Sequence, residues 1–137
     1  EFGRMNLKLI FEPGRSIVGS AGFIISKVIR VKKGLGKNFL ILDVGMNDLM
    51  RPSLYESYHH IIPMKKLNRK KRNYDIVGPV CESSDIFGSN RDLNEVKSGD
   101  YLILCSAGAY GSCMSSNYNC RPLIKEIVVN DSDFFKS

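Results

Sequence analysis

The stretch CESSDIFG, residues 81–88, combines side chains that can exchange protons with side chains that can bind charged groups. It places the thiol of Cys81 beside the carboxylate of Glu82, and a second carboxylate follows at Asp85. A free thiol has a pKa of about 8.5, so at neutral pH Cys81 is mostly protonated and can deliver a proton. The polar run 82–85 is too long for a buried strand, and the two residues after it are too apolar for a solvated loop. The stretch therefore predicts a functional site.

A second candidate group is the sequence RPSLY, in which Arg51 and Tyr55 stand four residues apart. On a helical turn this spacing directs both side chains to the same side. The forked guanidinium of an arginine, with a phenol beside it, suits a carboxylate better than the point charge of a lysine. Alone, such a pair next to a proline would more often be surface packing. The neighbouring His59 and His60 show no ligand pattern and are interpreted as structural.

Two glycine-containing segments could bring the backbone close to a bound group. In EPGR, residues 12–15, Gly14 would allow the main chain to approach a ligand such as a phosphate. In AGAYG, Tyr110 lies between Gly108 and Gly111, which free the backbone to present the ring. Taken singly, each segment is also consistent with a simple turn.

These groups must be positioned by a mainly β fold. The apolar run Leu7–Phe11 stops at Pro13 and Gly14, which predicts a buried strand that ends in a turn. Further strands are expected where β-branched, alternating runs are separated by Gly, Pro, Asn or Asp. These runs are 22–33, 39–44, 74–80, 101–105 and 124–129. Helical signals are confined to 92–96 and 109–117, so the pattern indicates a β-barrel or sandwich.

Length and composition limit the class of protein. A chain of 137 residues with 43% hydrophobic content can form one modest domain with a core. No apolar run reaches the length of about 18 residues that a membrane span needs, and the start lacks the apolar centre of a signal peptide. A cytoplasmic protein is therefore expected. The chain opens on Glu1 rather than Met, as expected of a processed or cloned piece of a longer protein.

The four cysteines do not indicate a metal site. They stand at 81, 105, 113 and 120, without a Cys-x-x-Cys pair and without the paired histidine spacing of a zinc module. No metal is expected. In the absence of secretory features, reduced thiols are favoured over disulfides.

A basic run contributes much of the formal net charge of +6. KKLNRKKR, residues 65–72, holds six cations and suggests a nucleic-acid surface. No aromatic residue is interleaved in it, as a base-stacking platform would require. A solvated loop is therefore favoured, and a basic β-barrel that binds nucleic acid is kept as an alternative.

Four segments are denser in functional residue types than a structural domain requires: EPGRSIVGSAG at 12–22, DVGMNDLMRPSLYESYHHI at 43–61, VGPVCESSDIFG at 77–88 and AGAYGSCMSSNYNCRP at 107–122. In this order and spacing they resemble the C-terminal part of the diaminopimelate decarboxylase family of fold-type III pyridoxal-phosphate enzymes. The resemblance runs from about Leu7 to about Val129. It implies the conversion of meso-2,6-diaminopimelate to L-lysine and CO2 in lysine biosynthesis.

The resemblance also implies a domain division. Residues 1–21 would be a remnant of the cofactor-binding (β/α)8 barrel, with its last strand and the turn after it. Residues 22–137 would be the C-terminal β-barrel domain of the alanine racemase-like type. The Schiff-base lysine for pyridoxal 5'-phosphate would then lie outside this chain, and the chain alone would be inactive.

By the same resemblance, individual residues take roles in a site shared across a homodimer interface. Cys81 would be the proton donor, Glu82 would bind the distal ammonium of the substrate, and Arg51 with Tyr55 would bind its distal carboxylate. Asp85 and the two serines before it would hold the loop's shape. The cofactor phosphate would be bound by Glu12, Pro13, Gly14, Arg15 and Tyr110, of which Arg15 and Tyr110 would also reach the substrate.

Ornithine, arginine and carboxynorspermidine decarboxylases share the fold and remain alternatives. An enzyme that forms a diamine must recognise only a distal cation, for which an acidic residue after the cysteine suffices. Here Glu82 is accompanied by Arg51 and Tyr55, which suits a distal end that bears both ammonium and carboxylate. Diaminopimelate is therefore favoured. A catalytically inactive homologue that only dimerises is a further alternative.

Overall fold

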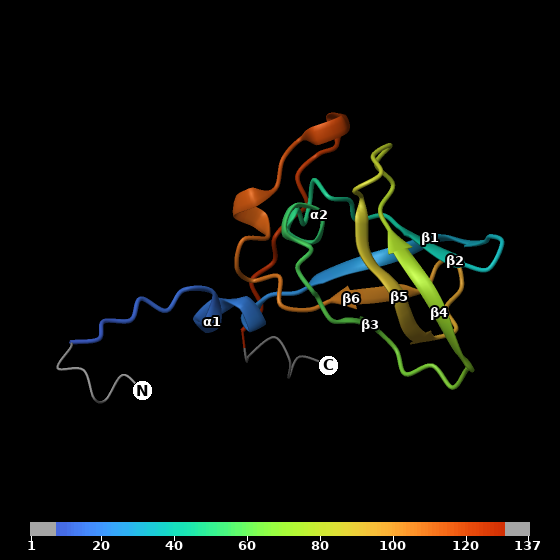
Figure 1. Cartoon of the computed structure of the whole chain (residues 1–137), viewed down its shortest axis with the longest axis horizontal. Coiled ribbons are helices and arrows are strands. Elements are labelled where there is room, and N and C mark those ends of the chain that lie inside the picture. The colour runs from blue at the N-terminus through green and yellow to red at the C-terminus, as the bar shows by residue number, and fades with distance from the viewer. Residues whose placement is uncertain (1–7, 131–137) are drawn as a thin grey trace.

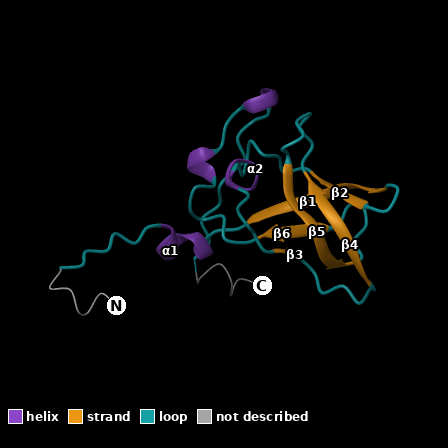
Figure 2. Ribbon diagram, viewed as in Figure 1, coloured by secondary structure: helices purple, strands orange, loops and turns teal. Residues whose placement is uncertain are grey.

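The structure is a computed structural model that describes residues 8–130. These residues form a six-stranded sheet that curves into a nearly closed barrel, with only short helical segments beside it (Figures 1 and 2). The strands are β1 (Ile24–Lys33), β2 (Asn38–Leu42), β3 (Ile61–Pro63), β4 (Lys71–Val77), β5 (Ile86–Asn94) and β6 (Tyr101–Leu104). The helices are α1 (Arg15–Val18) and α2 (Arg51–Tyr55), with single 3₁₀ turns η2 (Gly19–Ala21), η3 (Ser112–Met114) and η4 (Tyr118–Cys120).

The sheet has the strand order β3-β6-β1-β2-β4-β5. The pair β2 and β4 is parallel, and the other neighbouring strands are antiparallel. The two edge strands, β3 and β5, line opposite sides of one groove of about 400 Å³. The two edges of the sheet thus come near one another, as in a nearly closed barrel, which leaves few edge groups exposed.

The barrel interior is filled by apolar side chains from every strand. On β1, Ser26 and Val28 point inward while Ile25 and Lys27 are exposed, as the two-residue period of a strand requires. A register shift between Val28 and Arg30 interrupts this alternation. Burial of each large apolar side chain contributes about 1.5 to 3 kcal/mol. The fully enclosed apolar core residues are Val28, Leu40, Leu42, Leu49, Ile76, Leu102 and Leu104, with Tyr74 beside them.

Most of the expected strands are confirmed. The strands expected over 22–33, 39–44 and 101–105 are β1, β2 and β6, with ends that differ by one or two residues. The strand expected over 74–80 is β4, but it begins and ends three residues earlier because Lys71–Asn73 pair with β5. The mainly β fold is therefore correct.

The prediction of a helical turn over 92–96 is wrong. Residues 86–94 form β5, which sequence analysis missed together with the short strand β3. Asn90 has a positive φ of 52°, and its N–H donates to the Asp75 carboxylate at 2.8 Å. The pairing of β4 with β5 shifts register on either side of Ile76. Such an irregular strand lacks the alternating pattern that identifies regular strands.

The expected strands at the two ends of the chain are also wrong for the residues described. Residues 8–14 have no regular secondary structure, and Ile10 and Phe11 are exposed; Leu7 lies outside the described residues. Figure 1 shows this segment extending away from the sheet. Residues 121–130 are likewise irregular, with Val128 92% exposed. A strand needs a paired neighbour, and within residues 8–130 neither segment has one.

The helix expected over 109–117 is replaced by the single turns η3 and η4. Tyr110 has a positive φ of 57°, which is incompatible with a continuing right-handed helix. The backbone here follows a close crossing instead: Ala107 N–H donates to Gly22 O at 2.8 Å, and Gly108 N–H donates to Gly19 O at 3.0 Å. This crossing holds the segment after α1 against the segment that carries Tyr110.

The crossing depends on the absence of a side chain at Gly108. A Cβ atom there would lie 2.1 Å from Val18 O and 2.7 Å from Gly22 N, both of which are backbone atoms. We expect Gly108→Ala to lower the free energy of unfolding by about 1 to 3 kcal/mol, because the two backbones must separate. Urea denaturation measures this change. Gly14→Ala is the control, since a Cβ at Gly14 meets no atom within 4 Å; equal effects of the two substitutions would contradict the prediction.

Candidate active-site groups

The helix α2 positions Arg51 and Tyr55 as the sequence predicted. Pro52 near its first turn favours helix initiation, and Glu56 ends the helix in the left-handed conformation with φ 52°. The Arg51 guanidinium carbon lies 5.7 Å from the centre of the Tyr55 ring. The two side chains therefore point to the same side, within cation–π distance.

A third group from a distant segment joins this pair. The Arg51 guanidinium carbon also lies 5.7 Å from the centre of the Tyr110 ring, and Arg51 Nη2 donates a hydrogen bond to Ser57 Oγ at 3.0 Å. The side chains of Tyr55 and Tyr110 are about half exposed, at 58% and 48%. We call Arg51, Tyr55 and Tyr110 the Arg51 cluster. Its cation is half-buried and oriented by protein contacts, an arrangement that suits recognition of a carboxylate.

The imidazole of His59 is buried and lies close enough to three arginines for their charges to affect its pKa. Its Nδ1 lies 2.9 Å from Cys105 O, so Nδ1 carries the proton and donates it, whereas the buried Nε2 has no hydrogen-bond partner among the described residues. Burial lowers the pKa of His59, and the positive charges of Arg51, Arg15 and Arg91 lower it further, against the bond to Cys105. The field of these arginines indicates a site that favours anions.

The predicted catalytic stretch is an exposed turn held by a buried carboxylate. Cys81 and Glu82 are exposed, whereas Asp85 is 2% exposed. Asp85 accepts hydrogen bonds from Met46 N–H and Val80 N–H, both at 2.7 Å. The prediction that Asp85 holds the shape of this loop is confirmed. Burial raises the pKa of the Asp85 carboxyl above its usual value, against the lowering effect of these two bonds.

The loop over residues 45–48 connects the candidate groups to one another. Asp48, which is 1% exposed, accepts a hydrogen bond from Gly45 N–H at 2.8 Å and lies 3.7 Å from Arg121 Nη2. Ser116 N–H donates to Asn47 O at 2.9 Å, so the segment after Tyr110 is tied to this loop. Sequence analysis missed Asp48, Ser57 and Arg121, because local spacing carries no sign of partners so far along the chain.

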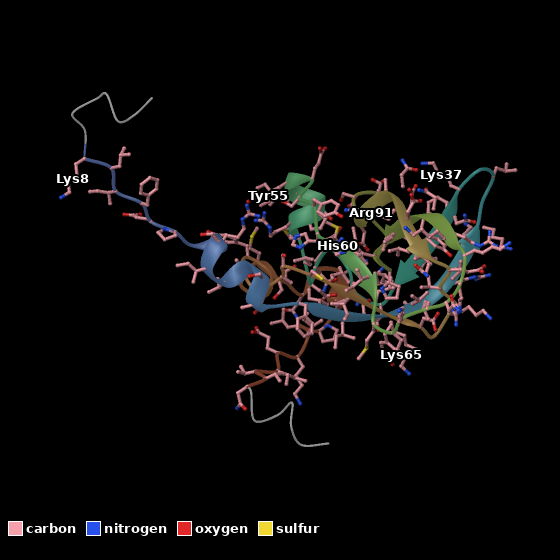
Figure 3. All side chains as sticks on the ribbon, turned by 90° about the horizontal axis from the view of Figure 1, so that it is seen from below. Lys8, Lys37, Tyr55, His60, Lys65 and Arg91 are labelled. Atoms are coloured by element: carbon pink, nitrogen blue, oxygen red, sulfur yellow. The ribbon has the colours of Figure 1, made fainter. Side chains whose placement is uncertain are left out.

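Not all predicted site residues come together within this chain. No hydrogen bond, ion pair or ring contact among residues 8–130 joins Cys81 or Glu82 to the Arg51 cluster. Figure 1 shows the turn that carries Cys81 projecting beyond β4 and β5. The segment Glu12–Gly14 is exposed, and in Figure 3 Lys8 lies at the far end of this extended part, away from Tyr55. The Glu12–Gly14 phosphate role and the other assigned roles remain predictions.

The basic run 65–72 has structural partners for its arginines. Arg69 pairs with Asp100 at 2.8 Å, and Arg72 pairs with Glu95 at 2.8 Å. These contacts fasten the run to the strand ends, and its lysines stay exposed. The four cysteines are free thiols. Within residues 8–130 there is no group of three metal-ligating side chains, and no helix is long and apolar enough to cross a membrane.

Comparison with known proteins identifies the class. Residues 16–108 match the family described as pyridoxal-dependent decarboxylase, C-terminal sheet domain. The chain therefore belongs to the pyridoxal-dependent decarboxylases, through their C-terminal sheet domain.

Particular relatives narrow the similarity. The chain is 52% identical over 124 residues to the diaminopimelate decarboxylase of Aquifex aeolicus, covering 90% of this chain and 30% of the relative. It is 51% identical over 127 residues to the diaminopimelate decarboxylase of Zymomonas mobilis, covering 91% of this chain and 30% of the relative. The crystal structure of Helicobacter pylori diaminopimelate decarboxylase complexed with L-lysine is 44% identical with a TM-score of 0.82, covering 94% of this chain and 32% of that one. The chain thus spans about 30% of the length of the curated relatives it matches.

The neutral, buried state of His59 predicts a specific pH dependence of stability. Its pKa is lowered in the folded protein from 6.5, so on acidification the unfolded chain binds the proton first. The contribution to stability is complete above pH 6.5 and decreases as pH falls from there toward the lowered pKa, by up to about 1.4 kcal/mol per pH unit. His59→Asn keeps an N–H for Cys105 O but does not titrate.

We expect wild type to lose more unfolding free energy than His59→Asn between pH 7.5 and 5.5, as measured by urea denaturation. Comparing changes with pH cancels the effect of the substitution itself and of the Asp85 carboxyl. Between pH 7.5 and 8.5 the two proteins should change equally, because His59 is neutral in both states there. Equal losses on acidification would show that His59 is not buried in neutral form.

Proposed function

We propose that the protein to which this chain belongs is a pyridoxal-phosphate-dependent diaminopimelate decarboxylase, a carboxy-lyase of lysine biosynthesis. It converts meso-2,6-diaminopimelate to L-lysine and CO2. The observation that carries the proposal is the Arg51 cluster, in which a half-buried guanidinium lies 5.7 Å from the centre of each of two phenol rings. Relatives with about 50% identity carry this name, which supports the choice.

The substrate class follows from the charges that the site must meet. Diaminopimelate has an ammonium and a carboxylate at its distal end, which does not react. Arg51, oriented by Ser57, binds the distal carboxylate with Tyr55, and Glu82 binds the distal ammonium. A substrate without the distal carboxylate leaves Arg51 unpaired, so the site discriminates against ornithine and against lysine itself.

The residues of this chain fit one side of a pyridoxal 5'-phosphate site. Gly14 borders open space, and the half-exposed Tyr110 can offer its hydroxyl. Arg15 supplies positive charge close enough to His59 to affect its pKa. Glu12, Pro13, Gly14, Arg15 and Tyr110 would hold the phosphate, and Arg15 and Tyr110 would also contact the substrate. The cofactor, when bound, supplies the electron sink for loss of CO2, and its Schiff-base lysine comes from outside this chain.

Cys81 delivers the proton that replaces the lost carboxylate, in a site shared between two protomers. Two observations support this assignment: the thiol is exposed, and within residues 8–130 no hydrogen bond, ion pair or ring contact joins Cys81 or Glu82 to the Arg51 cluster. In a two-fold dimer, the turn of one protomer can complete the site of its partner. Each site then contains Arg51 from one chain and Cys81 from the other.

The first test removes the distal carboxylate's partner in the full-length parent. We expect Arg51→Ala to lower kcat/KM for diaminopimelate at least about tenfold, a loss of about 1.5 to 3 kcal/mol for a charged hydrogen bond. Arg30→Ala, at an exposed arginine of β1, is the matched control and should leave kcat/KM unchanged. Unchanged kinetics for Arg51→Ala, or wild-type turnover of ornithine as fast as diaminopimelate, would refute the substrate assignment.

The second test addresses the shared site. Cys81→Ala and Arg51→Ala homodimers should each be nearly inactive, because every site lacks one essential group. After equal amounts are dissociated and reassociated, half of the dimers are mixed and each has one intact site, so roughly a quarter of wild-type activity should return. Reassortment is verified independently by native mass spectrometry. Activity that stays at the level of the parents would place both residues in one chain.

A further inference from the structure

The carboxylate of Asp85 connects two segments of backbone. Its Oδ1 accepts the N–H of Met46 and its Oδ2 accepts the N–H of Val80, each at 2.7 Å. Asp85 is 2% exposed, so these bonds replace the hydration that the charge has lost. Bonds from N–H groups to an ionised carboxylate are about twice as strong as neutral ones. One side chain thus fixes Val80, beside Cys81, to the 45–48 loop.

Backbone hydrogen bonds within the turn that carries Cys81 close this turn around the Asp85 carboxylate. Gly78 N–H donates to Asp85 O at 2.9 Å, and Glu82 N–H donates to Val80 O at 2.8 Å. A Cβ at Gly78 would lie 2.3 Å from both carboxylate oxygens, so only a glycine leaves room for the charge here. The position of Cys81 and Glu82 therefore depends on where the Asp85 carboxylate is held.

The 45–48 loop in turn leads directly into the helix that carries Arg51. Asp48 accepts the N–H of Gly45 at 2.8 Å, the next residue Leu49 is fully buried, and α2 begins at Arg51. Ser84 Oγ adds a contact of 3.7 Å to Met46 Sδ from the side of the turn. Asp85 and Arg51 are thus connected through the hydrogen bond to Met46 N–H and the short segment 46–51, in which Asn47, Asp48 and Leu49 are buried.

We infer that Asp85 is a positioning residue that sets the Cys81–Glu82 turn relative to the 45–48 loop and α2. Asp85 is 2% exposed and its carboxylate is turned toward two backbone N–H groups, so it acts through the turn rather than on a ligand. In a shared site, Asp85 would fix how far the turn of one protomer stands from its own Arg51, and so how it enters the partner's site. The catalytic part of this inference rests on the proposed function, whereas the structural part does not.

The structural part is tested on the chain itself with Asp85→Asn. This substitution keeps the shape of the side chain but removes its charge and turns one acceptor into an N–H₂ group that faces a backbone N–H. We expect the amides of Met46 and Val80 to exchange with deuterium at least about tenfold faster than in wild type. The core amides of Leu40 and Ile76 should keep their rates within about twofold, because their strands are not touched.

Two further variants make the result decisive. Asp92→Asn, the same substitution at an exposed aspartate of β5, should leave the amides of Met46 and Val80 unchanged. Gly78→Ala pushes the carboxylate from the other side and should accelerate the same amides as Asp85→Asn. Two outcomes would overturn the inference and show that Asp85 serves the fold rather than the turn. In the first, both Asp85→Asn and Gly78→Ala accelerate the core amides as much as those of Met46 and Val80. In the second, neither variant accelerates the amides of Met46 and Val80.

The catalytic part is tested in the full-length parent. Asp85→Asn should lower kcat at least about tenfold, whereas absorbance of bound pyridoxal phosphate and dimer formation stay as in wild type, which a general loss of folding would not allow. Faster exchange at Met46 and Val80 with unchanged kcat would overturn the positioning role. A parent that does not decarboxylate diaminopimelate at all would instead refute the proposed function, and the exchange result would stand independently of it.

Discussion

Two buried carboxylates hold one short loop, and the arrangement of the candidate site depends on them. Asp48 binds the 45–48 loop from within, and Asp85 binds it from the neighbouring turn. Buried charges are tolerated only when they are hydrogen-bonded or paired, and here backbone N–H groups and Arg121 meet that requirement. Because these partners lie at fixed positions in the fold, they favour the loop conformation in which both charges are satisfied.

The barrel supplies the fixed frame on which this loop acts. Its core strands place the loop after β2, the turn between β4 and β5, and the segment after β6 within reach of one another. The side chains suited to ligand binding lie on these connections rather than on the strands, as is usual when a rigid scaffold positions functional loops. The glycine crossing at Gly22 and Gly108 adds the segment after α1 to the same region.

Large apolar side chains remain exposed at both ends of the described chain, among them Phe11 at 81% and Val128 at 92%. Apolar surface of this kind usually marks a region that contacts another part of a protein or another subunit. The chain spans about 30% of its curated relatives, and both ends carry segments whose sequence favours strands. These exposed segments support the proposal that the site is completed by residues outside this chain.

The sequence by itself determined the mainly β class, the positions of β1, β2 and β6, and the helical turn that aligns Arg51 with Tyr55. These features depend on local patterns, namely alternation along a strand and a four-residue spacing on a helix. The four motifs also indicated the class of decarboxylase, because the types and order of their residues can be compared with a family without knowing the fold.

Only the tertiary structure showed that residues 86–94 form β5 and that residues 121–130 are irregular. It alone also showed which distant side chains contact the candidate site residues. An irregular strand forms because a neighbour accepts its bonds, and a regular pattern fails to form a strand when no neighbour is present. The cation–π pair of Arg51 and Tyr110 and the approach of Arg121 to Asp48 join segments far apart in the chain. Local sequence sets the preferences of each segment, but the choice of a distant partner is made by the packing of the whole barrel.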